Sequence, residues 1–326
     1  MCSEHKNCYI QILPQSKDDS YYAFYLYLPA GNGYYAQYRF FHLRKPADPN
    51  LTFTDKANNQ ANSDFYRVRT AYIGTLEGQF FNPCFRALQE GEISFAVREM
   101  GGADFSGGIH GDEILQKVVL AADGVPLPLD QPAFLCFQCL TFDETSYIYR
   151  CNTPDQKLIF HTQRYTASGN TLSLHQKIEW IADPMPLQAA YSPMLTAQRI
   201  DPDRPGEVLT DTVIFYDKPE GQMLAAIDTT GHGNAPKEGV SNKAYPPAPA
   251  MAAKVYGKKT GFAAEVGFFP VNDSIPREQI SNLLWLRYDK DLDSKVYFNI
   301  STGVEPKAGT VWESDIYYRL TYEPQA

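Results

Sequence analysis

Several signals that would assign this chain of 326 residues to a class at once are missing. Lysine and arginine never form a cluster longer than two, so the basic stripe of a nucleic-acid-binding protein is absent. No run approaches 18 apolar residues, and the N-terminus lacks the basic and apolar regions of a signal peptide. We therefore expect no nucleic-acid partner, no membrane partner and a cytoplasmic location, unless a leader was removed beforehand.

Familiar catalytic signatures are missing as well. We find no GxSxG elbow, no Ser-His-Asp arrangement, no Walker loop and no dinucleotide fingerprint. Cys136 and Cys139 form a CxxC pair, but positions i and i+3 of a strand point to opposite faces, which argues against one shared metal. We expect buried, reduced thiols, no bound metal and no cofactor. The cysteines are Cys2, Cys8, Cys84, Cys136, Cys139 and Cys151.

What the chain has is alternation at period two. Tyrosine (22) and phenylalanine (19) are abundant and suit pleated, half-buried surfaces. The pattern predicts an all-β, antiparallel β-sandwich, and 275–289 could form one short helix that runs into a strand. It is clearest in segments 20–30, 34–44, 93–99, 157–167, 171–182, 211–217, 260–270, 295–302 and 313–323.

Domain organisation follows from where this pattern stops and resumes. Residues 218–255 are rich in Gly, Pro, Lys and Ala, which predicts a long irregular excursion. Because the same strand character returns afterwards, we predict a single domain over 1–326. The sequence carries no signal for an oligomeric state.

The densest group of chemically active residues is the glycine-rich segment GGADFSGGIHGDE (101–113), which holds His110, Asp112 and Glu113. Glycines let a ligand approach the backbone closely, and a loop histidine can exchange protons. The alternative is a turn whose carboxylates cap backbone amides. The His-x-x-Glu spacing leaves a metal-dependent hydrolase open as a further possibility.

Two consecutive strands carry further ionisable residues. His175, Lys177 and Glu179 share one face of SLHQKIEW. In the preceding strand, His161 shares a face with Gln163 and Tyr165, and Arg164 lies on the other face. If these strands pair through the Ser-Gly-Asn turn, His161 and His175 could lie near each other on a shared polar face. The alternative for the His175 face is plain solvent exposure.

Single arginine and tryptophan residues complete the candidates. Arg98 ends a strand just before the glycine-rich segment and could bind a carboxylate or hydroxyls through its planar fork, or form a surface ion pair with Glu99. Trp180, Trp285 and Trp312 could serve as stacking platforms for a sugar, although a tryptophan in a β-protein is more often core.

The order of these features resembles a known superfamily. LSLHQKIEWIADPMPLQAAYSPMLTAQR, which contains Tyr191, resembles the central hairpin of galactose mutarotase-like proteins, and GGIHGDE resembles their upstream His-Gly step. KVYFNIST and GVEPKAGTVWESDIYYRLTY are similar to their closing strands, so the resemblance covers roughly 90–325. It implies a β-supersandwich with a concave sugar groove, a histidine acid and a carboxylate base.

These observations predict a carbohydrate-active enzyme that acts on a sugar or a uronic-acid-containing glycan by His/carboxylate acid–base chemistry. The reaction stays open among lyase, glycoside hydrolase and epimerase. A lyase would use Arg98 or Lys177 to neutralise a carboxylate, and a glycosidase would need two carboxylates such as Glu113 and Glu179. The alternative is a non-catalytic carbohydrate-binding or structural β-sandwich.

The predicted site has two groups of residues. The catalytic group is His110, Glu113, His175 and Glu179. The substrate-binding group is Arg98, Asp112, His161, Arg164, Lys177 and Tyr191.

Overall fold

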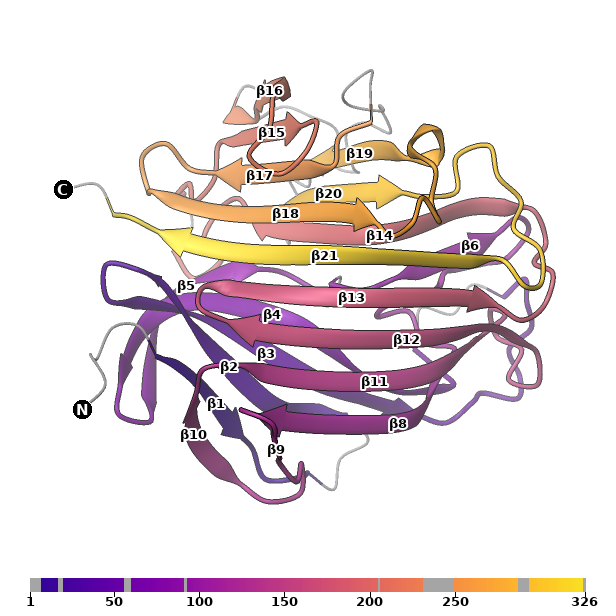
Figure 1. Cartoon of the computed structure of the whole chain (residues 1–326), viewed down its shortest axis with the longest axis horizontal. Coiled ribbons are helices and arrows are strands. Elements are labelled where there is room, and N and C mark those ends of the chain that lie inside the picture. Colours follow the sequence, from indigo (N-terminus) through magenta and orange to yellow (C-terminus); the bar gives the residue numbers. More distant parts are fainter. Residues whose placement is uncertain are drawn as a thin grey trace.

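The chain folds into two stacked layers of antiparallel strands (Figure 1). The computed structural model describes residues 7–16, 20–55, 60–90, 93–204, 206–230, 249–286 and 293–324. Within these ranges its helical structure is a 3-10 turn, η2, at Arg277–Gln279. The predicted all-β antiparallel sandwich is confirmed. No helix in the described ranges is long and apolar enough to cross a membrane.

The front layer in Figure 1 contains the strands of the central region and of the C-terminal end. Its order across the layer is β9 (Val125–Pro126), β8 (Glu113–Ala122), β11 (Leu140–Tyr149), β12 (Lys157–Ser168), β13 (Thr171–Trp180), β21 (Val311–Tyr322), β18 (Phe262–Pro270), β17 (Ala252–Tyr256), β15 (Thr212–Tyr216) and β16 (Met223–Asp228).

The rear layer contains the N-terminal strands β1 to β5 and later strands of the chain. Its order is β10 (Ala133–Phe137), β1 (Cys8–Ile12), β2 (Tyr21–Gly31), β3 (Tyr34–Lys45), β4 (Ser63–Glu77), β5 (Phe80–Leu88), β14 (Leu187–Gln198), β20 (Asp293–Asn299) and β19 (Ser281–Leu286). β6 (Ala96–Glu99) also pairs with β14, and β7 (Ser106–Gly107) pairs with β6. Two parallel pairs between β4 and β8 join the layers.

Aromatic side chains from the two layers meet in the core between them. Phe24 of β2 lies 5.2 Å from Phe142 of β11, and Phe40 of β3 lies 5.4 Å from Tyr165 of β12, as ring centroids. Alternation decides which residues take part, because successive strand residues face opposite sides of the sheet. The core therefore occupies one face of each layer and leaves the other face of each available for a site.

Two predicted elements differ from the structure. The excursion at 218–255 contains β16 and most of β17, so part of it is regular sheet, while 231–248 lie outside the described residues. The possible helix at 275–289 is only the turn η2 followed by strand β19, because the alternation of Leu284 and Leu286 with more exposed residues suits a half-buried strand. Residues 287–292 lie outside the described part of the chain.

Candidate functional site

A cavity of about 580 Å³ opens on the face of the rear layer that points away from the core. Strands β6, β14, β19 and β20 form its floor, and the glycine-rich loop forms one edge. A cavity of this size falls within the range of small-molecule sites, roughly 300–1,000 Å³. Its lining residues are Ala96, Arg98, Phe105, His110, Gln188, Ala189, Tyr191, Met194, Leu283, Trp285, Lys295, Tyr297 and Asn299.

Strand alternation supplies one side of this pocket. On β20, Lys295, Tyr297 and Asn299 face the pocket, whereas Val296 and Phe298 are fully buried in the core. On β19, Leu283 and Trp285 face the same way and the residues between them face inward. Period-two patterning therefore sorts these strands into a core face and a pocket face.

Strand β14 departs from strict alternation, and the departure shapes the pocket floor. Tyr191 and Met194 are three residues apart, so an unbroken strand would place them on opposite faces. The register with β20 shifts between these two residues, and both line the pocket. A bulge of this kind re-aims a side chain, which is why sequence alternation alone did not place Met194.

The glycine-rich segment folds back over β6 and carries His110 to the pocket edge. β7 pairs with β6, and the His110 amide then donates to the carbonyl of Gly107 in the following turn. Gly107 has a φ of +78°, and a Cβ there would lie 2.9 Å from the Phe95 carbonyl oxygen. At Gly111, with a φ of +97°, a Cβ would lie 2.6 Å from the Ala61 carbonyl oxygen. The loop needs glycine at both positions to pack this closely.

His110 has a carboxylate partner that the sequence did not single out. Its Nδ1 lies 3.3 Å from Oδ1 of Asp104, and the two side chains are 28% and 21% exposed. Burial alone would raise the pKa of Asp104, but the hydrogen bond and charge of His110, together with the Phe105 amide, lower it. Asp104 is therefore ionised and lies beside one imidazole nitrogen of His110, which lines the pocket.

Arg98 approaches the pocket from β6. Its Nε donates to the Gly102 carbonyl at 3.3 Å and its Nη2 donates to the Ala103 carbonyl at 3.2 Å. Glu99, the next residue, points to the opposite side and pairs with Arg150. The alternative of a surface Arg98–Glu99 pair is therefore wrong, because adjacent strand residues face opposite ways.

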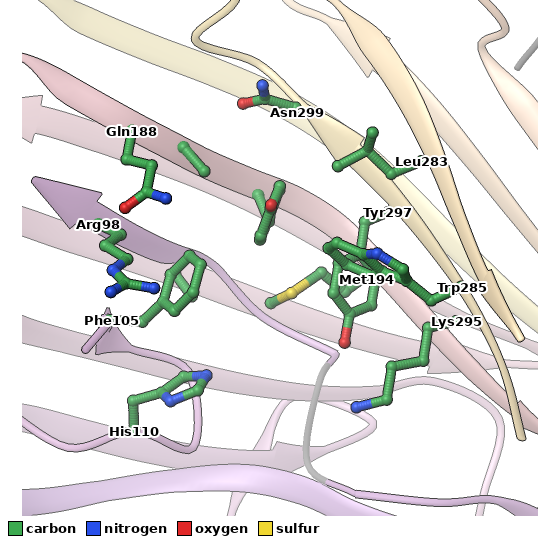
Figure 2. A pocket seen from close by; sticks show the side chains of 13 residues that line it. Arg98, Phe105, His110, Gln188, Met194, Leu283, Trp285, Lys295, Tyr297 and Asn299 are labelled. Carbon is green, nitrogen blue, oxygen red and sulfur yellow. The ribbon is translucent and has the colours of Figure 1, made fainter. Parts of the chain in front are cut away.

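Aromatic rings form the wall opposite Arg98 and His110. Trp285 and Tyr297 meet edge to face at 4.7 Å, and the Tyr191 ring lies 5.1 Å from Tyr297. Figure 2 shows Arg98 and His110 on one side of the pocket and Trp285, Tyr297 and Lys295 on the other. The arrangement places flat apolar surfaces across from hydrogen-bonding and charged groups.

Phe105 connects the two sides of the pocket. Its ring lies 5.1 Å from the His110 imidazole and stacks at 5.3 Å on Tyr191. Burial raises the pKa of Tyr191 to about 12, against the opposing charge of Arg98. The Tyr191 hydroxyl therefore carries its proton at neutral pH.

The structure brings together His110, Arg98 and Tyr191 from the predicted set and buries two others elsewhere. Glu113 and His161 lie fully buried between the layers. Glu113 accepts from Arg67, from Ser146 and, at 3.0 Å, interacts with Nδ1 of His161. Arg67 also lies 3.3 Å from Glu144. We call Arg67, Glu113, Glu144, Ser146 and His161 the buried network.

Burial and ion pairing act against each other in the buried network. Burial would raise the pKa of Glu113, but Arg67, His161 and Ser146 bring it down to about 2. Burial raises the pKa of Glu144 to about 8 despite Arg67, and the charge of Glu113 adds to this rise. Burial also lowers the pKa of His161. Arg67 thus balances one carboxylate, Glu113, while Glu144 is protonated at neutral pH.

The predicted pairing of 157–167 with 171–182 is confirmed, but the shared histidine face is wrong. His161 is opposite Ile178 and points into the core, whereas His175 is opposite Arg164 and points outward. The register pairs odd-numbered residues of β12 with even-numbered residues of β13, so two odd-numbered residues, His161 and His175, face opposite sides of the sheet.

The remaining charged candidates lie on the outer face of the front layer. His175 is 2.8 Å from Asp315 and 3.3 Å from Glu313. Lys177 pairs with Glu179 at 3.3 Å, and Arg164 pairs with Asp143 at 2.6 Å. This face fits the solvated alternative, and none of these residues lines the pocket.

Asp112 and two of the tryptophans have structural surroundings. Asp112 is buried and accepts from the Asn152 amide at 2.9 Å. Burial raises its pKa to about 6. Trp180 and Trp312 pack edge to face in the core at 5.4 Å, so Trp285 is the tryptophan that reaches the pocket.

The cysteines and possible metal ligands differ in part from expectation. Cys8 and Cys151 are buried, but Cys84, Cys136 and Cys139 are exposed, so the prediction of buried thiols is wrong for these three. All five are free thiols, and Cys2 lies outside the described residues. Within the described ranges, no three His, Cys, Asp or Glu residues cluster as metal ligands, and His110 and Glu113 face different surroundings.

Comparison with known proteins finds similarity of structure only. No protein-family model matches the chain, and no curated protein matches it in sequence. A GH36 α-galactosidase from Geobacillus stearothermophilus is 10% identical with a TM-score of 0.41, over 94% of this chain and 41% of that one. This chain thus spans about two fifths of the α-galactosidase.

Two further solved structures match along most of their length. The Slr1438 protein from Synechocystis sp. PCC 6803 is 11% identical with a TM-score of 0.39, over 99% of both chains. A galactose mutarotase related enzyme from Lactobacillus acidophilus is 9% identical with a TM-score of 0.34, over 78% of this chain and 95% of that one. All three TM-scores lie below 0.5, so membership of the predicted superfamily stays a prediction.

Proposed function

We propose that the protein is a carbohydrate-active enzyme whose site is the pocket lined by Arg98, His110, Tyr191 and Trp285. One observation carries the proposal: an aromatic wall faces a His110–Asp104 pair and an arginine across a cavity of about 580 Å³. Aromatic rings offer apolar faces to the C–H surfaces of a sugar, and the polar side offers partners to its hydroxyls.

His110 and Tyr191 each carry out one of the two proton transfers. His110, held by Asp104, is the base, because a carboxylate on one imidazole nitrogen stabilises the cation formed at the other. Tyr191 is the acid, because its hydroxyl is protonated at neutral pH and it lines the pocket together with His110. In a lyase it would give this proton to the leaving oxygen. Asp104 replaces Glu113 and Glu179 as the carboxylate of the His/carboxylate pair.

This division favours a lyase or an epimerase over a glycosidase. Hydrolysis with two carboxylates requires both to flank the scissile bond. The pocket lining contains no Asp or Glu among the described residues, Glu113 is closed in the buried network, and Glu179 is on the outer face of the front layer. A lyase or an epimerase needs one base and one acid, which His110 and Tyr191 supply.

Product analysis tests the proposal. The purified protein is incubated with neutral and acidic oligosaccharides, and unsaturated, epimerised and intact products are separated. We expect turnover, and His110→Gln lowers it about 10²–10⁴-fold, the range of one acid–base catalyst. His175→Gln is the matched control, because this histidine lies on the opposite layer, and its turnover stays unchanged.

The alternative is a non-catalytic carbohydrate-binding protein. Most of the described residues that line the pocket are aromatic or apolar, and this favours the binding function. His110 and Tyr191 are the pair that an enzyme would use for proton transfer. Recovery of every bound oligosaccharide intact would establish this alternative. Failure of every oligosaccharide to bind would reject both functions.

A further inference from the structure

The pocket differs in charge from the molecule around it. The whole chain has a formal net charge of −9. The described residues that line the pocket nevertheless include two fixed cations, Arg98 and Lys295, and no Asp or Glu. A concentration of positive charge in one cavity of an acidic protein attracts an anion locally while the rest of the surface repels it.

The two cations are not equivalent. Lys295 Nζ lies 2.6 Å from the Glu90 carboxylate, which balances its charge. In the described part of the chain, no carboxylate lies within ion-pair distance of Arg98. Asp104, which is close enough to be influenced by Arg98, is bound to His110 and to the Phe105 amide. Arg98 is therefore the cation that a ligand can neutralise.

The guanidinium of Arg98 is held in a way that leaves one edge for a ligand. Nε and Nη2 donate to two successive carbonyls, Gly102 and Ala103, which occupy the side of the fork nearest the chain. A guanidinium has five N–H donors, so the two N–H groups of Nη1 and the second N–H group of Nη2 remain. One N–H from each of these nitrogens forms a parallel pair that matches the two oxygens of a carboxylate. The backbone contacts fix the orientation of the guanidinium before binding.

We propose that the pocket binds an acidic sugar, a uronic acid, whose carboxylate pairs with Arg98 while its ring lies toward Trp285 and Tyr297. The inference rests on the proposed function and names its substrate class. One unbalanced arginine matches one carboxylate on each bound sugar, which favours a uronic acid over a sugar with several sulfate groups.

Matched pairs of oligosaccharides test the inference by calorimetry. The probes are oligosaccharides of galacturonan, alginate and hyaluronan, each compared with its own carboxyl-reduced form, together with a sulfated galactan oligosaccharide. We expect at least one polyuronate to bind tenfold or more tightly than its reduced form, with an affinity that falls as salt is added. Arg98→Met removes this preference, so the ratio of the two affinities falls to about one. Arg98→Lys retains part of the preference.

Arg164→Met is the matched control, because it removes an arginine from the outer face of the front layer and changes the net charge equally. It keeps the full preference. Equal or tighter binding of the reduced or sulfated probes overturns the uronic-acid inference and leaves the proposed function standing. If none of the probes binds, the proposed function itself fails, and the inference fails with it.

Discussion

Two groups of described residues, the buried network and the pocket, combine arginine, carboxylate and histidine in very different surroundings. In the buried network, Arg67 pairs with Glu113, and Glu113 also holds His161, with every side chain almost or fully inaccessible. At the pocket, Arg98 and His110 flank Asp104 with the histidine 28% exposed. The same residue types therefore serve the core in one place and face a cavity in the other.

The two groups differ in what balances the positive charge of the arginine. Arg67 has Glu113 and Glu144 as partners, so the buried network is closed and no ligand is needed to balance it. Arg98 donates to two backbone carbonyls and lies over the Phe105 ring, and among the described residues no carboxylate forms an ion pair with it. Clusters of ionisable residues are thus insufficient to locate a site, and access together with an unbalanced charge is the better criterion.

The largest expected effect is a difference in the free energy of unfolding between variants of Arg67 and Arg98. Arg67→Met leaves the Glu113 carboxylate buried without its cation, and the free energy of unfolding falls by about 3–5 kcal/mol. Arg98→Met, the matched control, lowers it by less than about 1 kcal/mol because it loses only hydrogen bonds to carbonyls at a half-buried site. Urea unfolding measures both. Equal losses of unfolding free energy in the two variants would contradict the distinction between the buried network, in which Arg67 is paired, and the pocket, in which Arg98 can accept a ligand.

A second prediction concerns pH. The folded state holds the pKa of Glu144 at about 8, above the ordinary value of 4.5, so its contribution to stability is complete below pH 4.5 and is lost as pH rises through 8. Glu144→Gln keeps the shape and removes this titration. The loss of stability between pH 5 and pH 9, on the order of a few kcal/mol in the wild type, becomes smaller. An unchanged slope in the variant would assign the titration to another group.

The next effect concerns the orientation of His110. Asp104→Asn keeps a hydrogen-bond partner but removes the charge, and turnover falls on the order of tenfold, equivalent to about 1.4 kcal/mol. We expect kcat to fall while KM changes little, because Asp104 contacts His110 and is not among the residues that line the pocket. An unchanged kcat in this variant would remove Asp104 from the proton transfer.

The smallest effect concerns the aromatic wall. Trp285→Ala weakens oligosaccharide binding several-fold, by about 0.5–1.5 kcal/mol, and has little effect on unfolding. Trp312→Ala is the contrast, because this buried ring supports the core and its loss lowers stability by about 3–5 kcal/mol. Calorimetry and urea unfolding separate the two. Undiminished binding by the Trp285 variant would remove this ring from the site.

Strand structure was predictable because side-chain alternation records which face is buried. In β13, Leu174, Ile178 and Trp180 are buried and His175 faces outward, as the pattern indicates. The sequence also predicts chemistry in the glycine-rich loop, and His110 lines a pocket. The sequence does not predict which layer carries that pocket, because which outer face is hollowed depends on long-range packing, which alternation within one strand does not encode.

The rest of the site depends on contacts between residues distant in sequence. Arg67 reaches Glu113 and Glu144 at separations of 46 and 77 residues, so nothing local distinguishes Glu113 from a loop carboxylate. Trp285 and Trp312 both lie in strands, β19 and β21, yet one lines the pocket and the other is core. Asp104 gave no signal apart from its place in the glycine-rich segment.

The most direct test of the pocket is imidazole NMR during titration with the polyuronate oligosaccharide that binds most tightly. Single His→Gln variants assign the resonances of His110, His161 and His175. The His110 signals should shift as the oligosaccharide is added, while those of His161, closed in the core, and His175, on the opposite layer, stay in place. A shift of His175 with His110 unmoved would contradict the assignment of the site to the pocket.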